Sequence, residues 1–246
     1  MWETTIKGRP LHFHLAGINN QNFIMRDEET GSWWQQVTGA AIYGPLKGER
    51  LRFVAHDELT FATWKNELPT AEAGRVLRPD ERVAARYAPA NWEDRMVDAP
   101  VVTPAEQKGN GQGVDAFAPR VLVVGIELDG HAKAYPLTAL PGQSPIMDTI
   151  GGVPVMIVLG DDHKSVRAFV REIDGHALEL FRRPDAPSFT LVDAETGSEW
   201  DFTGTARVGQ LAGRELKQLP VLLDYWFDWK SYHPQTQIYR ASEPRL

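Results

Sequence analysis

The sequence predicts a mostly β fold, a β-rich α+β protein with two internally duplicated β units related by pseudo-symmetry. Two observations lead to this prediction. Residues 2–77 and 169–239 align as two copies of one unit. Short runs rich in Val, Ile, Phe, Trp and Thr also alternate with turn residues about every eight to twelve positions. Runs of that length between regular turns are typical of β strands.

The duplication appears when the chain is compared with itself, which is the first search that a sequence requires. The segment DEETGSWW at residues 27–34 matches DAETGSEW at 193–200 in six of eight positions. Further along, GPLKGERL at 44–51 corresponds to GQLAGREL at 209–216. The matches keep their order over about seventy residues. We therefore expect a first repeat at 1–77, a Pro- and Gly-rich linker at 78–119, and a complete domain at 120–246 that contains the second repeat.

The individual elements follow from turn chemistry and hydrophobic runs. Lys7-Gly8, Asp129-Gly130 and Asp174-Gly175 each lie between strand-like runs, which predicts three hairpins whose turns need positive φ. The hairpin around Asp129-Gly130 is expected to join strands at 121–128 and 132–135. Residues 153–159 form an uninterrupted apolar run, which predicts a buried strand. A short helical turn is expected at the end of each repeat, at 64–67 and 229–232, before a Pro.

The chain contains eight Trp residues. Four of them recur in both repeats, so we expect them to form core and to be largely buried: Trp34, Trp200, Trp64 and Trp229. Trp33 aligns with a glutamate in the second repeat. It is therefore the strongest candidate for an exposed aromatic platform.

Composition excludes several classes of function. The formal net charge is −7 and no large basic cluster occurs, which argues against a nucleic-acid partner. The absence of cysteine excludes disulfides, thiolate metal sites and Cys nucleophiles. No apolar run approaches the ~20 residues that span a bilayer, and no signal peptide is recognised, so we expect a soluble protein without a membrane span.

Several phrases are similar to a known family. TGSWWQQVTGAAIYGPLKG, AYPLTAL, MDTIGGVPV and WFDWKSYHP resemble the family called domain of unknown function 3179. Residues 120–246 follow the whole motif order, whereas residues 1–77 match only its later part. The resemblance implies a mostly bacterial or archaeal protein, extracytoplasmic in many members. It implies no activity, and the Cys-Pro-x-Cys-like segment of many members is replaced here by VLGDDH at 158–163.

The strongest cluster of candidate ligand-binding residues is a set of Asp, Thr and Ser side chains that recurs at equivalent positions of the two repeats. Its functional interpretation is a polar pocket with an aromatic wall. Its structural alternative is a satisfied Asp/Thr turn over a buried Trp. Asp148, beside a Gly-Gly pair, either lines a cleft or caps a turn. The candidates are Asp27, Thr30, Ser32, Trp33, Asp148, Asp193, Thr196 and Ser198.

His12 and His14 flank Phe13 on an expected strand, so both rings leave the same face, as a divalent transition metal would require. They have no counterparts in the second repeat, and a third ligand is needed.

The sequence supports two hypotheses about function. The leading one is a non-catalytic binding or scaffolding protein with a cleft between the duplicated units and a small molecule or protein as partner. The alternative is a metal-assisted enzyme that uses His12 and His14.

Overall fold

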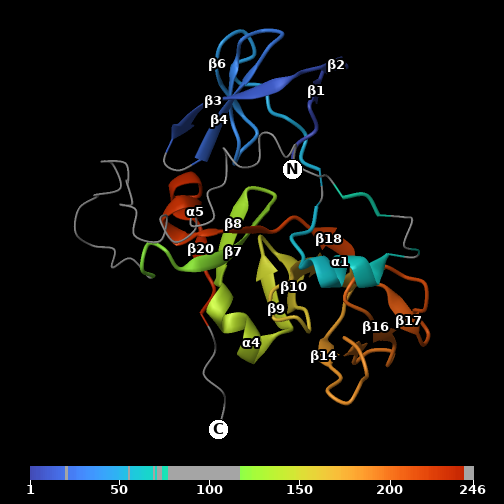
Figure 1. The fold of residues 1–246 in the computed structure, drawn as a ribbon. Coiled ribbons are helices and arrows are strands. Elements are labelled where there is room, and N and C mark those ends of the chain that lie inside the picture. Colours follow the sequence, from blue (N-terminus) through green and yellow to red (C-terminus); the bar gives the residue numbers. More distant parts are fainter. Residues whose placement is uncertain (20–21, 55, 69, 71–73, 77–116, 241–246) are drawn as a thin grey trace.

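The computed structural model in Figure 1 describes residues 1–240 except 20–21, 55, 69, 71–73 and 77–116. In this part of the chain strands predominate, in four sheets of four strands and two of two strands. The mostly β class is therefore confirmed. The predicted linker at 78–119 lies almost wholly outside the described residues.

The first repeat forms a hairpin and an antiparallel sheet in the order β3-β4-β5-β6, followed by one helix. Register shifts occur in the β3–β4 and β5–β6 pairs. The elements are β1 (Thr5–Ile6), β2 (Arg9–Pro10), β3 (Phe13–Asn19), β4 (Asn22–Asp27), β5 (Trp33–Gln35), β6 (Ala41–Tyr43) and α1 (Phe61–Glu67).

The C-terminal domain begins with two sheets, in the orders β18-β11-β10-β9 and β19-β7-β8-β20, in which only β20 runs parallel to its neighbour. Its first elements are β7 (Leu122–Leu128), β8 (His131–Pro136), η2 (Leu137–Ala139), α4 (Leu140–Gln143), β9 (Ile146–Ile150), β10 (Val153–Leu159) and β11 (Val166–Val170). The predicted hairpin at Asp129-Gly130 is present, with φ of 49° and 80°, and the predicted strand at 153–159 is β10.

The second repeat contributes the rest of that domain. A hairpin and a sheet in the order β14-β15-β16-β17 are followed by strands that return to the two larger sheets. The elements are β12 (Glu172–Ile173), β13 (His176–Ala177), β14 (Leu180–Arg182), β15 (Leu191–Asp193), β16 (Glu199–Trp200), β17 (Ala206–Val208), β18 (Lys217–Leu219), β19 (Leu222–Tyr225), α5 (Trp226–Tyr232) and β20 (Gln237–Ile238).

The core of the C-terminal domain has two layers on either side of β10 and β11. On one side, Ile157 and Ala168 pack with Val124 and Tyr135 of the β7–β8 sheet. On the other side, Met156 and Phe169 pack with residues of the second repeat, including Trp200. Alternate residues of a strand point to opposite faces, and here both faces of the strand pair are covered. The sequences of these strands are therefore almost continuously apolar.

The two repeats share their local geometry. Lys7-Gly8 and Asp174-Gly175 both form hairpin turns with positive φ, as predicted. A side chain at Gly39 would collide with the ring of Trp2, and one at Gly204 would collide with the ring of Phe169 in the same way. At five equivalent positions, both repeats place a buried hydrophobic residue in their cores. The pairs are Ile6 and Ile173, Leu11 and Leu178, Trp34 and Trp200, Ala41 and Ala206, and Leu51 and Leu216.

One expectation about the tryptophans is wrong. Trp34, Trp200 and Trp229 are 0%, 1% and 2% exposed, but Trp64 is only half-buried. The reason is the position of α1, which has no buried residue and lies on the surface of the molecule. Both helices also begin three residues earlier than the expected turns at 64–67 and 229–232. For α1 the start is fixed by the Thr60 side chain, which accepts a hydrogen bond from the Thr63 amide.

The helix α1 contacts Asp162 and Arg167, which lie directly before the second repeat. The hydroxyls of Thr60 and Thr63 donate to Asp162 at 2.6 and 2.8 Å. The buried guanidinium of Arg167 on β11 pairs with Asp57 at 2.7 Å and with Glu67 at 2.6 Å. These contacts join the end of the first repeat to the segment that precedes the second repeat.

The first repeat lies at one end of the molecule, with α5 beneath it (Figure 1). A direct link between them is the hydrogen bond from the Asn22 amide of β4 to the Asp228 carboxylate of α5. Trp2 and Phe169 are the first residues of the two aligned repeats. The strand that carries Phe169 pairs with β10, whereas the described pairing of Trp2 is a single bridge to Phe53. The pairing of this strand with β10 therefore has no counterpart among the described residues of the first repeat.

None of the described helices is both long enough and apolar enough to cross a lipid bilayer.

Candidate functional site

Most of the predicted ligand-binding residues belong to two closed hydrogen-bonded turns. In the first, the Asp27 carboxylate accepts from the indole Nε1 of Trp34 at 2.7 Å and from the backbone amide of Thr30 at 2.6 Å. The Ser32 hydroxyl lies 2.6 Å from the Thr30 hydroxyl and accepts from the Leu46 amide at 3.0 Å. Burial alone would raise the pKa of Asp27, but these donors together outweigh it and lower that pKa.

The second repeat builds the same turn. Asp193 accepts from Trp200 Nε1 at 2.8 Å and from the Thr196 amide at 2.6 Å. Ser198 lies 2.7 Å from the Thr196 hydroxyl and accepts from the Leu211 amide at 3.0 Å. In both repeats the Asp and Ser side chains are buried, and their partners belong to the turn, to the Trp that follows it or to a backbone amide about 13 residues further on. This geometry favours the structural alternative for all six residues.

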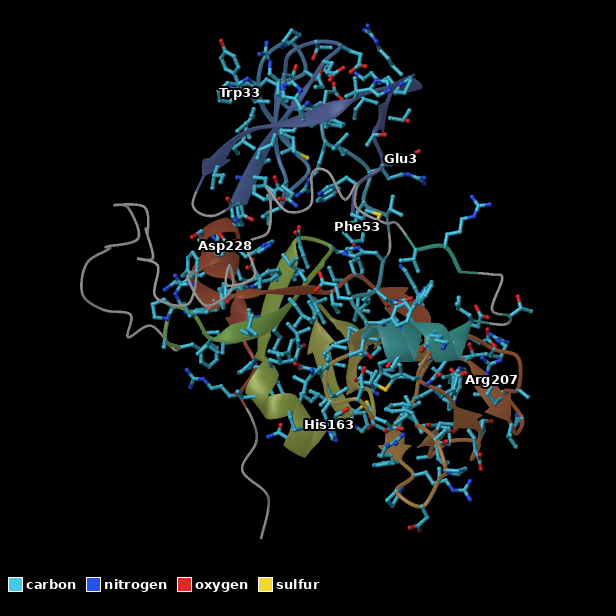
Figure 2. The ribbon with its side chains drawn as sticks, in the orientation of Figure 1. Glu3, Trp33, Phe53, His163, Arg207 and Asp228 are labelled. Atoms are coloured by element: carbon cyan, nitrogen blue, oxygen red, sulfur yellow. The ribbon has the colours of Figure 1, made fainter. Side chains whose placement is uncertain are left out.

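Trp33 and Asp148 occupy different parts of the molecule. Trp33 is 41% exposed and meets Tyr43 edge to face with ring centroids 6.0 Å apart. Figure 2 shows it at the end of the first repeat that points away from the C-terminal domain. Asp148 on β9 pairs with Lys133 at 2.6 Å and accepts from the Tyr135 hydroxyl at 2.9 Å. The structure therefore does not bring these two candidates together.

His12 and His14 each face a glutamate. His12 Nδ1 lies 2.6 Å from Glu29, and this carboxylate raises the pKa of His12. His14 Nδ1 lies 4.0 Å from Glu28. Across the described residues, no group of three or more His, Asp or Glu is arranged to hold a metal ion. The metal hypothesis stays a prediction without a third ligand in this part of the chain.

A cavity of about 610 Å³ lies between the first repeat and the C-terminal domain. We call it the interunit cleft. Leu51 and Phe53 line it from the first repeat, and Leu222 and Trp229 line it from the C-terminal domain. In Figure 2 the labelled Phe53 lies at the end of the first repeat nearest to the other half. The walls of the cleft also include Gly125 and Glu127 of β7, which lie outside both repeats.

Two aspartates at the wall of the interunit cleft form what we call the carboxylate pair. Asp224, at the end of β19, lines the cleft, and Asp228 lies one helical turn further on, in α5. Asp228 is 6% exposed and accepts from the side-chain amide of Asn22. Asp224 accepts from the backbone amide of Tyr225 at 2.7 Å. Figure 2 shows Asp228 on α5 beside the first repeat.

The environment of this pair opposes ionisation. Burial raises the pKa of Asp224 to about 8, and the neighbouring charge of Asp228 acts in the same direction. Burial likewise raises the pKa of Asp228 despite the hydrogen bond from Asn22. The pKa of Tyr232, one turn beyond Asp228, is also raised by burial and by Asp228. Both carboxyl groups therefore favour the protonated form more than an exposed aspartate does.

A second titratable pair lines the same cleft. His233 Nδ1 lies 3.9 Å from Glu127, and its ring stacks on Trp229 with centroids 3.9 Å apart. Burial lowers the pKa of His233, although Glu127 acts in the opposite direction. Neutral imidazole and a protonated carboxyl group are both able to donate and accept hydrogen bonds. The cleft thus combines apolar side chains with polar and charged ones, among them Arg50, Glu58 and Asp129.

The sequence contained a signal for the carboxylate pair. Asp224 and Asp228 are only four residues apart. However, Asp224 lies on β19 and only Asp228 lies in α5, so their spacing is not that of two positions on one helix. Burial of the pair depends on contact with Asn22, which is 206 positions away in the chain. No local pattern predicts a contact of that kind.

Comparison with known protein families matches residues 1–236 to the family described as "Protein of unknown function (DUF3179)". Neither the curated proteins nor the solved structures gave a match.

Proposed function

The chain belongs to the DUF3179 family of proteins of unknown function, and we propose that it is a binding protein that holds a small molecule in the interunit cleft. The cavity of about 610 Å³ between the two halves is the observation that carries this proposal. Small-molecule sites are typically clefts of ~300–1,000 Å³ with apolar walls and a few fixed polar groups.

The lining fits that description. Phe53, Leu222 and Trp229 provide apolar surface, while Asp224 and His233 supply hydrogen-bonding groups. Both halves of the molecule contribute, so a ligand would touch surfaces that are far apart in the sequence. Such sites commonly lie between domains.

Binding is favoured over covalent catalysis by the chemistry of the lining. The lining residues that the structure describes include no Ser, Cys, Lys or Tyr. The hydroxyl of Thr38 donates to Gln35 at 2.7 Å and has no base beside it. A nucleophile next to a general base is the usual signature of covalent catalysis. The alternative enzyme, with a metal on His12 and His14, would place its chemistry outside the interunit cleft.

A screen of small molecules by thermal unfolding tests the proposal. A ligand that binds only the folded protein stabilises it by ~2.7 kcal/mol at one hundred times its Kd. Val37 lines the cleft from a turn of the first repeat, so Val37→Trp should fill it. The matched control is Ile42→Trp, because Ile42 is exposed on β6 and does not line the cleft.

Compounds that raise the Tm of the wild-type protein should lose this effect in Val37→Trp and keep it in Ile42→Trp. Both variants should first show a Tm close to that of the wild-type protein. If the compounds stabilise both variants equally, their site is elsewhere and the proposed function is wrong.

A further inference from the structure

Four side chains form one row across the outer face of the sheet in the first repeat. The register pairs His14 with Arg26, Arg26 with Trp33 and Trp33 with Tyr43, so each of β3, β4, β5 and β6 contributes one residue. Directly paired residues place their side chains on the same face of a sheet. All four are exposed, Trp33 by 41% and Tyr43 by 66%, whereas Trp34 on the opposite face is buried. We call these four residues the outer row.

Two rings at one end of the outer row form a corner. The centroids of Trp33 and Tyr43 are 6.0 Å apart, and the ring planes meet at 69°. The corner depends on an irregular strand pair, because Trp33 pairs with Tyr43 and Trp34 with Ala41, which leaves Ile42 as an extra residue. A bulge of this kind redirects a side chain, and here it brings Tyr43 beside Trp33. Two ring surfaces at this angle can both touch a single ring-sized group.

A positive charge lies beside the corner. Arg26 is the cross-strand neighbour of Trp33, and its guanidinium lies beside Gly31, where an added Cβ would be 3.0 Å from Nη2. Within the described residues the Arg26 side chain has neither a salt bridge nor a hydrogen bond. A guanidinium is always charged and matches a carboxylate with two parallel donors. An anionic group of a ligand at the corner would therefore meet Arg26.

The outer row is not part of the duplicated scaffold. The residues at the same register in the second repeat are Phe181, Val192, Glu199 and Val208. There Glu199 takes the place of Trp33 and is paired with Arg183. The repeats share their turns and core positions, but the ring corner and its cation occur only in the first. The shared structure therefore does not explain why Trp33 and Tyr43 are exposed.

The outer row is also too narrow for a folded protein partner. Leu15 and Phe23 are exposed as well, but each lies an odd number of positions from His14 or Arg26 in its own strand, so both belong to the opposite face. A stable protein interface buries about 800 Å² on each partner, far more than four side chains in a line provide. Nucleic acid is disfavoured by the net charge of −7. These observations favour a small ligand or one unit of a chain.

We propose that the outer row binds an acidic saccharide, with a pyranose ring against Trp33 and Tyr43 and its carboxylate on Arg26. A shallow exposed site covers one side of its ligand and leaves the rest in water. A pyranose fits such a site, because its C–H face packs on an aromatic ring while its hydroxyl groups stay solvated. The site is separate from the interunit cleft, whose lining contains none of the four residues. Figure 2 shows Trp33 and the cleft residue Phe53 at opposite ends of the first repeat.

The test compares matched acidic and neutral oligosaccharides. The probes are tetramers of galacturonate, glucuronate and mannuronate, each with its methyl ester, titrated calorimetrically into the full chain. At least one acid tetramer should bind, about tenfold or more tightly than its ester, the ratio expected for one charge-assisted contact. If no acid tetramer binds, or if acid and ester bind equally, the inference is wrong.

Two variants assign the binding to the outer row. Trp33→Ala should weaken binding of acid and ester about tenfold or more, because apolar contact area is lost. Arg26→Gln should lower the affinity for the acid to that for the ester and leave the ester unchanged. Both residues are exposed, so each variant should unfold at a Tm close to that of the wild-type protein.

Matched controls separate the site from general effects of ring and charge. Phe181→Ala removes an exposed ring from the corresponding row of the second repeat, and Arg9→Gln removes an exposed positive charge from β2 of the first. Both controls should bind the acid tetramer as the wild-type protein does. Undiminished acid binding in Trp33→Ala or in Arg26→Gln would overturn the inference.

The remaining outcomes identify other occupants. If sedimentation shows self-association that Trp33→Ala abolishes, and no acid tetramer binds, the face contacts a second copy of the chain and the inference is wrong. Val37→Trp fills the interunit cleft and should leave acid binding unchanged. Loss of acid binding in Val37→Trp alone would place the saccharide in the cleft, which contradicts this inference but not the proposed function.

Discussion

At the residue scale, two buried aspartates show that donors decide whether a carboxylate is charged. Asp27 accepts hydrogen bonds from Trp34 and Thr30, and these donors lower its pKa against the effect of burial. Asp224 has few such donors and faces a second carboxylate, so burial and Asp228 raise its pKa. The first residue stabilises a turn, whereas the second is available to a ligand.

Substitution of the indole donors should destabilise both repeats similarly. Trp34→Phe and Trp200→Phe each leave a buried aspartate without its Nε1–H donor. Each variant should lose about 1–3 kcal/mol of unfolding free energy, the usual cost of an unsatisfied buried group. Urea unfolding measures this loss. The interpretation of the two turns as equivalent would be wrong if only one variant were destabilised.

At the element scale, the position of α5 depends on a glycine in β7. A Cβ at Gly125 would lie 2.2 Å from the Trp229 ring, so the helix packs against β7 only because no side chain intervenes. Gly125→Ala should displace Trp229 and destabilise the protein by about 1–3 kcal/mol, as overpacking of a core does. Gly142→Ala is the control, because nothing lies within 4 Å of its added Cβ. Thermal unfolding and Trp fluorescence should change in the first variant alone.

The helix α1 is held by charge rather than by burial. Arg167 is the buried centre of this contact, with Glu67 and Asp57 as its partners. Glu67→Gln removes one charge and should loosen α1 at a cost of about 1–3 kcal/mol. Hydrogen exchange of the amides in residues 61–67 should become faster. The control Lys65→Gln alters an exposed residue of the same helix, and unchanged exchange in Glu67→Gln would contradict the prediction.

The elements that the sequence predicted correctly are those set by local chemistry. Turns such as Lys7-Gly8 and Asp174-Gly175 need positive φ, and neighbouring residues suffice to specify them. The burial of Trp64 was predicted wrongly because it depends on where α1 binds, and the partners of that helix lie about one hundred residues away. The carboxylate pair was missed for the same reason. Its neutral state depends on tertiary burial, which no local pattern contains.

At the scale of the whole molecule, each repeat ends in a helix that contacts the other half. The helix α1 of the first repeat pairs with Arg167, which lies directly before the second repeat. The helix α5 of the second repeat accepts a hydrogen bond from Asn22 of the first. The interunit cleft lies beside the second of these contacts, so its shape depends on how the halves meet. Ionisation of the carboxylate pair should therefore affect the stability of the whole chain.

The pH dependence of stability tests this coupling. The pKa of Asp224 is raised from 3.8 to about 8 in the folded protein. Between these values the folded protein holds a proton that the unfolded chain releases, so the unfolding free energy falls as the pH rises. The decline amounts to at most ~1.4 kcal/mol per pH unit for one proton. Asp224→Asn cannot ionise and should show a flatter profile in urea unfolding between pH 5 and pH 8, whereas Asp185→Asn, which alters an exposed residue, should follow the wild-type profile. Parallel profiles for all three proteins would show that Asp224 ionises freely in the folded state, contrary to the burial and crowding of charge at the interunit cleft.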